Sequence, residues 1–311
     1  MRPLASKSAQ RALPFLFERQ RLLLALLDVL GGRAANVDFQ KLLFLFCQEQ
    51  SASGAYEFVP YKFGAFSFTS YADRRKLIER GLVAEEENHW QLTAEGKRAV
   101  GPAQDLLLSD FARRIRPLRG DELVAETYRR FPYYATRSEI AERVLRGDHA
   151  ALQRIEAARP SAKKSPGVST IGYEGRTLER YLNDLLQSGV TLLCDVRRNP
   201  ISRKYGFSKS TLAKGCEGVG IRYEHLPELG IASDQRQTLE TQADYDLLFA
   251  KYESKDLPLQ GVALAKIDEW IRSGARVALT CYERLPEQCH RHCVAEALER
   301  NFGKGLAARH L

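Results

Sequence analysis

The second half of the chain alternates continuous apolar runs with amphipathic helical segments, and this pattern constrains the fold most. Val190–Val196 is a continuous apolar run, and Thr177–Ser188 before it places its leucines on one helical face. Further strands are predicted at 168–173, 220–225 and 276–281, and further helices at 209–217, 244–252, 261–273 and 289–301. This pattern is typical of a parallel sheet covered by helices on both faces. We therefore expect an α/β, Rossmann-like, doubly wound and mostly parallel domain over residues 166–311, with its strand order left open.

The first half of the chain has a different pattern, in which helices precede a hairpin. Apolar residues recur at helical spacing over Arg19–Leu30 and Asp38–Gln48, and a third helix is predicted to end near Arg80. Gly81–Val83 and Trp90–Thr93 then flank a polar tip, which predicts a β-hairpin. We expect an α+β winged-helix-like domain over residues 1–100.

Residues 101–165 are predicted to form a helical, arginine-rich connector. Aromatic residues are interleaved with its arginines, an arrangement that suits phosphate contact and base stacking but also a connector packed between domains. Ser161–Gly167 has the composition of a linker. The domain boundary is therefore expected there.

The positive charge of the chain is concentrated in its first half. The formal net charge is +8, and residues 166–311 hold 20 basic and 19 acidic side chains, which leaves +7 for residues 1–165. A local excess of this size favours a polyanion partner. Nucleic acid is the partner we expect, with a protein partner of the N-terminal domain as the alternative.

The sequence predicts no membrane segment. Its longest strongly apolar run, Leu22–Leu27, is far short of the ~20 residues that span a bilayer. The chain has six cysteines, too few for a disulfide-dense secreted scaffold, and Cys281, Cys289 and Cys293 are crowded together. We expect a cytoplasmic protein in which these cysteines have a local chemical role.

In a DNA-binding winged helix the third helix enters the major groove. The residues predicted to contact nucleic acid, there and in the connector, are Ser67, Thr69, Arg74, Arg75, Lys76, Arg113, Arg114 and Arg116. The alternative for the helix is a solvated basic face. A hairpin tip that carries Glu85, Glu86 and Glu87 would repel phosphates, which favours a protein partner instead.

In open α/β sheets, ligands bind beyond the carboxyl ends of the strands. This rule selects polar side chains from four loops of the second half: Tyr173, Glu174, Asp195, Arg197, Arg198, Ser202, Arg203, Tyr223, His225, Cys281, Glu283, Cys289, His290 and Arg291. Asp195 or Glu283 would transfer protons, and the arginines would hold an anion. The alternative for Asp195 and Arg197 is a structural ion pair that holds the loop.

The cysteines of this edge allow three interpretations. Cys281, Cys289 and the residues after it provide enough soft ligands for a zinc ion. If Cys289 begins the last helix, the helix N-terminus would lower the pKa of its thiol and favour a catalytic thiolate. The third interpretation is that the cysteines pack without reacting.

Several motifs of the second half occur in a fixed order. They are Ile171–Glu174, Asp195–Arg197 with Pro200, Ser202-Arg203, Gly206–Ser208, Gly220-Ile221-x-Tyr223, Leu226-Pro227-x-Leu229-Gly230, Cys281-x-Glu283 and Cys289–Arg291. Through them, residues 168–311 resemble the family called domain of unknown function 488. The resemblance implies that Asp195, Arg197, Ser202, Arg203, Cys281, Glu283, Cys289, His290 and Arg291 share one site. His292 and Cys293 lie outside the family motif, which favours Cys281, Cys289 and His290 as the candidate ligands if the site binds zinc.

The N-terminal half also resembles a known family. The helix segment Lys41–Leu45, the turn Phe63–Ser67 and the hairpin motifs Gly81–Val83 and Leu92–Gly96 are similar to the winged-helix-like domain of the Panacea antitoxins. This resemblance implies a DNA-binding or protein-binding module.

Taken together, these features predict a hydrolase-like enzyme that cleaves nucleic acid or a nucleotide, or modifies its base or sugar. A non-enzymatic alternative is a DNA-binding regulator whose cysteines sense metal or oxidant. An antitoxin-like protein-binding module is the third hypothesis. No cofactor beyond zinc is indicated.

Overall fold

The computed structural model describes residues 15–50, 54–101, 106–160, 166–236, 239–302 and 307–311. Within these ranges, no helix has both the length and the apolar character needed to cross a membrane. The chain divides into two compact units, Met1–Tyr56 with Ser70–Leu123, and Glu57–Thr69 with Val124–Leu311. Most of the linker predicted at 161–167 lies outside the described residues, and the predicted three-part division stays a prediction.

The second unit contains a five-stranded sheet in which every neighbouring pair is parallel, which confirms the predicted α/β class. Its order is β7 (Arg222–His225), β6 (Leu192–Asp195), β8 (Arg276–Cys281), β5 (Gly167–Gly172) and β9 (Arg309–His310). The last strand along the chain, β9, was not predicted. Because β8 lies between β5 and β6, the ends of these three strands meet at one edge.

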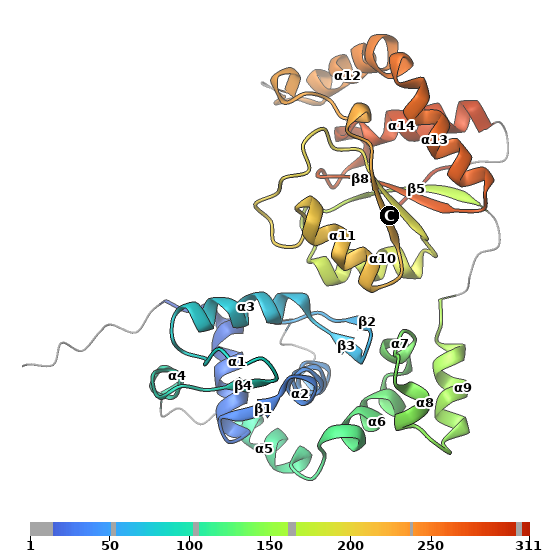
Figure 1. Ribbon diagram of the computed structural model, residues 1–311. Helices are drawn as coiled ribbons and strands as arrows, with labels where there is room; N and C mark the ends of the chain where they lie inside the picture. Colours follow the sequence, from blue (N-terminus) through green and yellow to red (C-terminus); the bar gives the residue numbers. More distant parts are fainter. Residues whose placement is uncertain (1–14, 51–53, 102–105, 161–165, 237–238, 303–306) are drawn as a thin grey trace, which may run out of the picture. The chain divides into compact units, whose positions relative to one another are not determined.

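Two apolar cores cover the faces of this sheet. Leu192 and Cys194 of β6 point into one core, and Leu193 points into the other. The first core is closed by α12 (Gln242–Lys251), α13 (Gly261–Arg272) and α14 (Arg291–Phe302), and the second by α10 (Leu178–Gln187) and α11 (Lys209–Gly218). Figure 1 shows the two helix groups on opposite faces of the sheet. Burial on both faces explains why the strands read as continuous apolar runs.

Helix α10 shows how the sequence specifies an element of this layer. The Thr177 hydroxyl caps the helix by accepting a hydrogen bond from the backbone N–H of Arg180 at 3.1 Å. The apolar face predicted from spacing is buried: Leu178, Tyr181, Leu182, Leu185 and Leu186. The second unit also contains short 3-10 helices, η1 (Pro227–Leu229), η2 (Ser233–Arg236), η4 (Leu257–Gln260) and η5 (Pro286–Gln288), and a π-helix, η3 (Tyr252–Asp256).

The second unit also includes a small hairpin from the first half of the chain. Strands β2 (Val59–Tyr61) and β3 (Gly64–Phe66) pair antiparallel, and Val59 lies in the same core as α10. The buried carboxylate of Glu179 on α10 accepts hydrogen bonds from the Ser67 hydroxyl and from the backbone and side chain of Thr69. The remaining helices of this unit are α7 (Pro132–Ala135), α8 (Ala141–Val144) and α9 (His149–Ala157), while α6 (Gly120–Arg130) spans the unit boundary.

The first unit combines helices with a short strand pair. Its elements are α1 (Glu18–Val29), β1 (Arg33–Ala35), α2 (Asn36–Glu49), α3 (Phe68–Glu79, which begins in the second unit), β4 (His89–Gln91), α4 (Ala94–Val100) and α5 (Leu106–Ile115). Trp90 of β4 is fully buried and stacks on Phe39 of α2 at a centroid distance of 4.2 Å. The predicted hairpin is reduced to one antiparallel bridge between Val83 and Leu92, and β4 pairs along its length with β1.

A buried lysine in the first unit makes its stability depend on pH. Burial lowers the pKa of Lys41 on α2 from 10.5 to about 7. Between these values the unfolded chain binds a proton that the folded chain has lost, so the free energy of unfolding rises with pH. From about pH 7 to about pH 8.5, we expect this group to contribute a rise of up to about 1.4 kcal/mol per pH unit.

The Lys41→Met variant should lack this contribution. Urea unfolding of the wild type and the variant at about pH 7 and about pH 8.5 measures the contribution of Lys41. Subtracting the change in the variant from the change in the wild type cancels the groups that titrate in both proteins. Equal pH dependence in the variant and the wild type would show that Lys41 keeps its ordinary pKa.

Candidate functional site

A pocket of about 360 Å³ opens where strands β5, β6 and β8 end. Its lining residues are Tyr173, Arg197, Arg198, Asn199, Ile201, Ser202, Arg203, Ile231, Arg236, Cys281, Tyr282, Glu283 and His290. The loops predicted to converge at this edge therefore do so. Eight of the residues predicted there line the pocket: Tyr173, Arg197, Arg198, Ser202, Arg203, Cys281, Glu283 and His290.

Asp195 and Arg197 form a buried ion pair beneath this pocket. Asp195 is fully buried, and Arg197 is 5% exposed. The guanidinium donates from Nε to Oδ1 at 2.8 Å and from Nη2 to Oδ2 at 2.5 Å. Tyr223 donates its hydroxyl to Oδ2 at 2.6 Å. Both carboxylate oxygens are thus occupied, and Asp195 is not among the residues that line the pocket.

Arg197 is held rigidly by further contacts. Its Nη1 donates to the Tyr173 hydroxyl and to the Phe207 carbonyl, both at 2.9 Å. The Tyr173 ring stacks on Phe207 at a centroid distance of 4.4 Å. Burial alone would lower the pKa of Arg197, but the hydrogen bonds and charge of Asp195 raise it. The Arg197 guanidinium is therefore held in one orientation at the pocket.

The loop after β6 supplies two more cationic side chains. Arg198 and Arg203 are exposed, and both line the pocket. The loop is braced internally, since the Ser208 hydroxyl accepts from the Ser202 backbone N–H at 3.1 Å. A firm loop with exposed guanidinium groups at its surface suits the binding of an anion.

Besides Asp195 and Cys289, four residues predicted for the site lie around the pocket rather than in its lining. Tyr223 donates to Asp195, and His225 Nε2 lies 2.9 Å from the Arg197 carbonyl oxygen. Glu174 accepts a hydrogen bond from the backbone N–H of Arg284 at 2.9 Å. Arg291 is buried and donates to the carbonyl oxygens of residues 283 and 284. Their contacts hold the loops that form the pocket.

Glu283 has a cationic partner that strand-end reasoning missed. Arg236, from turn η2, donates from Nη2 to its Oε1 at 3.1 Å. Burial raises the pKa of Glu283 above its ordinary value. Arg236 does not directly follow a strand in the sequence, so only the need of the half-buried Glu283 for a cationic partner could have pointed to it. Tyr282, 45% exposed, is a second lining residue that was not predicted.

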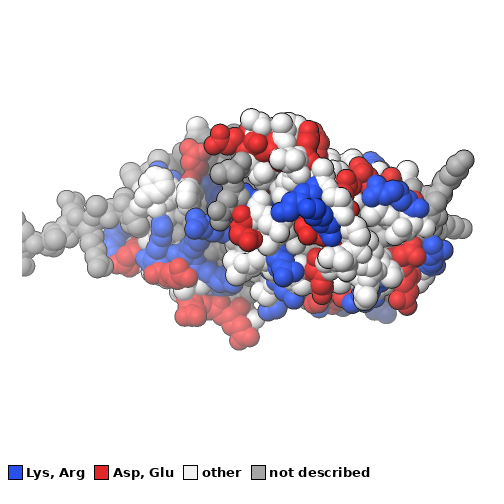
Figure 2. Space-filling view, turned by 90° about the horizontal axis from the view of Figure 1, so that it is seen from above, with Lys and Arg blue, Asp and Glu red and all other residues white. Residues whose placement is uncertain are grey.

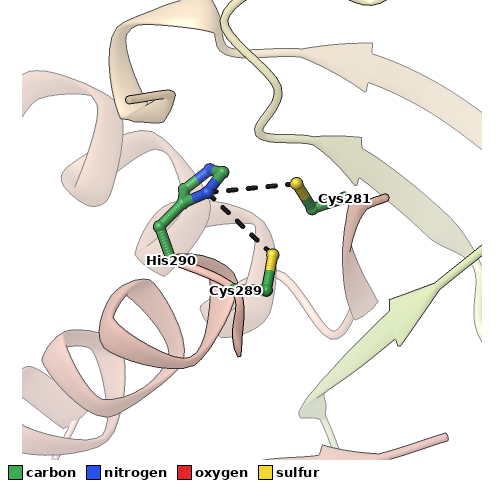
Figure 3. Close-up of side chains that lie close together, drawn as sticks. All are labelled: Cys281, Cys289 and His290. Atoms are coloured by element: carbon green, nitrogen blue, oxygen red, sulfur yellow. Dashed lines mark hydrogen bonds between the residues drawn. The ribbon is translucent and has the colours of Figure 1, made fainter. Parts of the chain in front are cut away.

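Two cysteines and a histidine meet at the pocket floor. The ligand atoms of Cys281, Cys289 and His290 all lie within 4.8 Å of one another, and all three residues are buried. Figure 3 shows both sulfur atoms facing the same ring nitrogen of His290. The Cys281 thiol also donates to Glu283 Oε2 at 3.3 Å.

The predicted start of the last helix at Cys289 is wrong. Helix α14 begins at Arg291, and the backbone of Cys289 is extended, with φ −143°. Burial, aided by Cys281, raises the pKa of the Cys289 thiol to about 11, which is opposite to the predicted lowering. Cys293 lies apart from the trio, with its sulfur 3.4 Å from Nε2 of His292.

The residues predicted to contact nucleic acid through the first half differ in accessibility. Ser67 is fully buried, and Arg74 is 8% exposed. Arg74 donates to the carbonyl oxygens of Glu86 and His89, because it packs beside Trp90 under the polar tip. Arg75, Lys76 and Arg116 are exposed, and Arg113 is exposed but pairs with Asp110. Thr69 bonds to Glu179, and Arg114 pairs with Glu49 and Asp110.

Charge distinguishes the edge pocket from a second pocket of the described residues. On the face seen in Figure 2, basic and acidic side chains are interspersed. A second pocket, of about 410 Å³, is lined by four carboxylates: Asp246, Glu253, Glu287 and Glu296. The edge pocket has four arginines and one carboxylate, so it is the one suited to an anionic ligand.

Comparison with known proteins agrees with the resemblance of the second half. Residues 177–298 match the family described as "Domain of unknown function DUF488". No curated protein and no solved structure matched the chain. The Panacea resemblance of the first half stays a prediction. The matched segment contains the loop after β6, the end of β8 and the Cys289-His290 turn. Over residues 177–298 this chain is therefore similar to the DUF488 family in the part that forms most of the pocket.

Proposed function

We propose that the edge pocket binds a phosphate-bearing unit of nucleic acid, or a nucleotide, and that the domain cleaves it hydrolytically or modifies its base or sugar. The observation that carries this proposal is that four guanidinium groups line one pocket beside a single carboxylate. Arginine binds phosphate oxygens bidentately, and a pocket of this volume is in the range of small-ligand sites.

The four arginines differ in the task that their contacts allow, and Arg236 is already paired with Glu283. Arg197 is locked by Asp195, so its charge is already oriented before a ligand arrives. Arg198 and Arg203 are exposed and can close on a phosphate. Tyr282 offers a half-exposed ring at the rim on which a base can stack.

Proton transfer is assigned to Glu283 rather than to Asp195. Both oxygens of Asp195 are occupied by Arg197 and Tyr223, and its side chain is fully buried. Glu283 lines the pocket and is 17% exposed, so it can reach a bound ligand. Asp195 is a positioning residue in this scheme.

The Arg198→Ala/Arg203→Ala double variant tests the proposal. Labelled plain and base-modified DNA would be incubated with the wild type and the variant at two salt concentrations, then run on gels before and after alkali. We expect shortened or alkali-labile strands with the wild type and at least about tenfold less with the variant. The slope of log affinity against log salt should fall by about 2, since each phosphate contact contributes about 0.9.

The matched control is Arg180→Ala, which removes an exposed arginine of α10 outside the pocket. It should behave like the wild type. A double variant that matches the control would refute the role of the pocket. A salt-sensitive shift without product would favour the DNA-binding regulator, and no signal on any DNA would refute the DNA-processing function.

We also propose that the first unit is a winged-helix module that delivers the enzyme to DNA. Its support is the order of α1, β1, α2 and α3 before the Val83–Leu92 bridge and β4. Arg75 and Lys76 are the exposed basic residues of α3. Replacing both with alanine in the same gel assay discriminates the partners, because a protein-binding module predicts unchanged DNA affinity.

A further inference from the structure

We infer that Cys281, Cys289 and His290 form a zinc site with one coordination position open to the edge pocket. The inference stands on the geometry of these three side chains and does not rest on the proposed ligand of the pocket. Cysteine thiolate and imidazole are the ligands that zinc prefers in proteins.

The spacing of the ligand atoms is close to that of a zinc centre. The Cys281 and Cys289 sulfur atoms lie 3.9 and 4.0 Å from Nδ1 of His290 (Figure 3). An ion about 2.3 Å from sulfur and about 2.0 Å from nitrogen places tetrahedral ligand atoms about 3.6 Å apart. Small side-chain rotations are enough to close this difference.

The tautomer of His290 is set for metal binding. Its Nε2 lies 3.0 Å from the Val196 carbonyl oxygen, an acceptor, so Nε2 carries the proton. The lone pair of Nδ1 is then directed at the two sulfur atoms. Metal-binding histidines almost always donate their other N–H to such an acceptor.

The three ligands are held by the framework of the domain. Cys281 ends the central strand β8, and Cys289 with His290 precedes α14. The intervening loop is fixed, because Arg291 donates to the carbonyl oxygens of Glu283 and Arg284 at 2.7 and 3.0 Å. A site built on such fixed elements keeps its geometry without a bound ion.

The fourth position faces the pocket. Cys281 and His290 line the pocket, whereas Cys289 does not, so the cluster is approached from that side. Among the described residues, Cys293 and His292 do not belong to the cluster. Three protein ligands and one open position are typical of catalytic rather than structural zinc. Glu283, next to Cys281, would be the carboxylate beside the open position.

The experiment is metal analysis of the full-length protein purified under reducing conditions without chelator. We expect about one zinc per chain, and strong visible and thiolate charge-transfer absorption after exchange for Co²⁺. The Cys281→Ser, Cys289→Ser and His290→Ala variants should each bind zinc at least about 100-fold more weakly, since even outer contacts cost 10–100-fold. Circular dichroism would establish that each variant is folded.

The matched control is Cys293→Ser, which should keep the metal because the Cys293 side chain does not belong to the cluster. If the ligand variants fail to fold, the thiolate charge-transfer band of the Co²⁺-loaded wild type alone decides whether the cysteines bind the metal. The inference would be overturned by any of three results. The wild type takes up neither zinc nor Co²⁺, the Co²⁺ spectrum shows no thiolate ligation, or Cys281 and Cys289 form a disulfide instead of binding metal. No substrate is used, so this result and the gel assay can fail independently.

Discussion

Replacing Asp195 with alanine is expected to lower the free energy of unfolding of the second unit by about 3–5 kcal/mol, because it leaves a buried guanidinium without its counter-charge. Arg197 has 6% of its side chain exposed, and it cannot turn to solvent while Tyr173 and Phe207 hold it. Urea unfolding followed by the fluorescence of Trp270, which lies in the core of this unit, measures the effect in a Trp90→Phe background.

The matched control for this prediction is an ion pair near the surface. Asp268 accepts from Arg272 at 2.7 Å, and the arginine is 58% exposed, so Asp268→Ala should cost less than about 1 kcal/mol. Adding Arg197→Met to Asp195→Ala should restore part of the lost stability. If Asp195→Ala costs no more than Asp268→Ala, the pair does not have the role given to it here.

The Asp195 result also bears on how activity is tested. A variant that destabilises the domain and releases Arg197 loses activity whether or not Asp195 transfers protons. Loss of turnover in Asp195→Ala therefore identifies no catalytic residue. The exposed pair Arg198 and Arg203 gives a cleaner test, since neither side chain is buried.

Replacing Gly172 with alanine should cost about 3 kcal/mol, at the upper end of overpacking effects. A Cβ atom at Gly172 would lie 1.8 Å from the carbonyl oxygen of Glu283 and 2.7 Å from its carbonyl carbon. Both are backbone atoms that Arg291 holds in place, so the 283–284 loop must move away from β5. We expect lower stability by urea unfolding and weaker zinc binding together.

Gly261→Ala is the matched control for this substitution. Gly261 begins α13, and no atom lies within 4 Å of the position of its Cβ. Alanine there should change stability by less than about 1 kcal/mol and leave metal binding unaltered. Equal behaviour of the two variants would mean that β5 and the loop do not approach as closely as described.

Much of the second unit could be predicted from local pattern. The strand at Arg276–Cys281 has the predicted bounds, and the start of α11 at Lys209 is also as predicted. Apolar runs and helical faces are properties of neighbouring residues, so they can be read before the chain is folded. The rule that ligands bind at strand ends then selected eight of the lining residues, Glu283 among them.

Local sequence pattern could not predict which of these residues line the pocket and which hold its loops in place. Tyr223, His225 and Arg291 share the edge with Arg203, yet they bond to backbone or to Asp195. Arg236 reaches the pocket from turn η2, which does not directly follow a strand in the sequence. These outcomes depend on strand order and on the path of loops, which follow from contacts between distant residues.

By itself, the sequence determined the alternating elements, their apolar faces and the set of polar residues at one edge of the sheet, because each is set by neighbours along the chain. Only the tertiary structure decided that Asp195 forms a buried ion pair with Arg197 and that Cys281 and Cys289 both lie close to His290. The position of β8 between β5 and β6 brings Cys281 and His290 to the same pocket as Arg197 of the loop after β6. Strand order is a cooperative result of packing both faces of the sheet, and no local pattern encodes it.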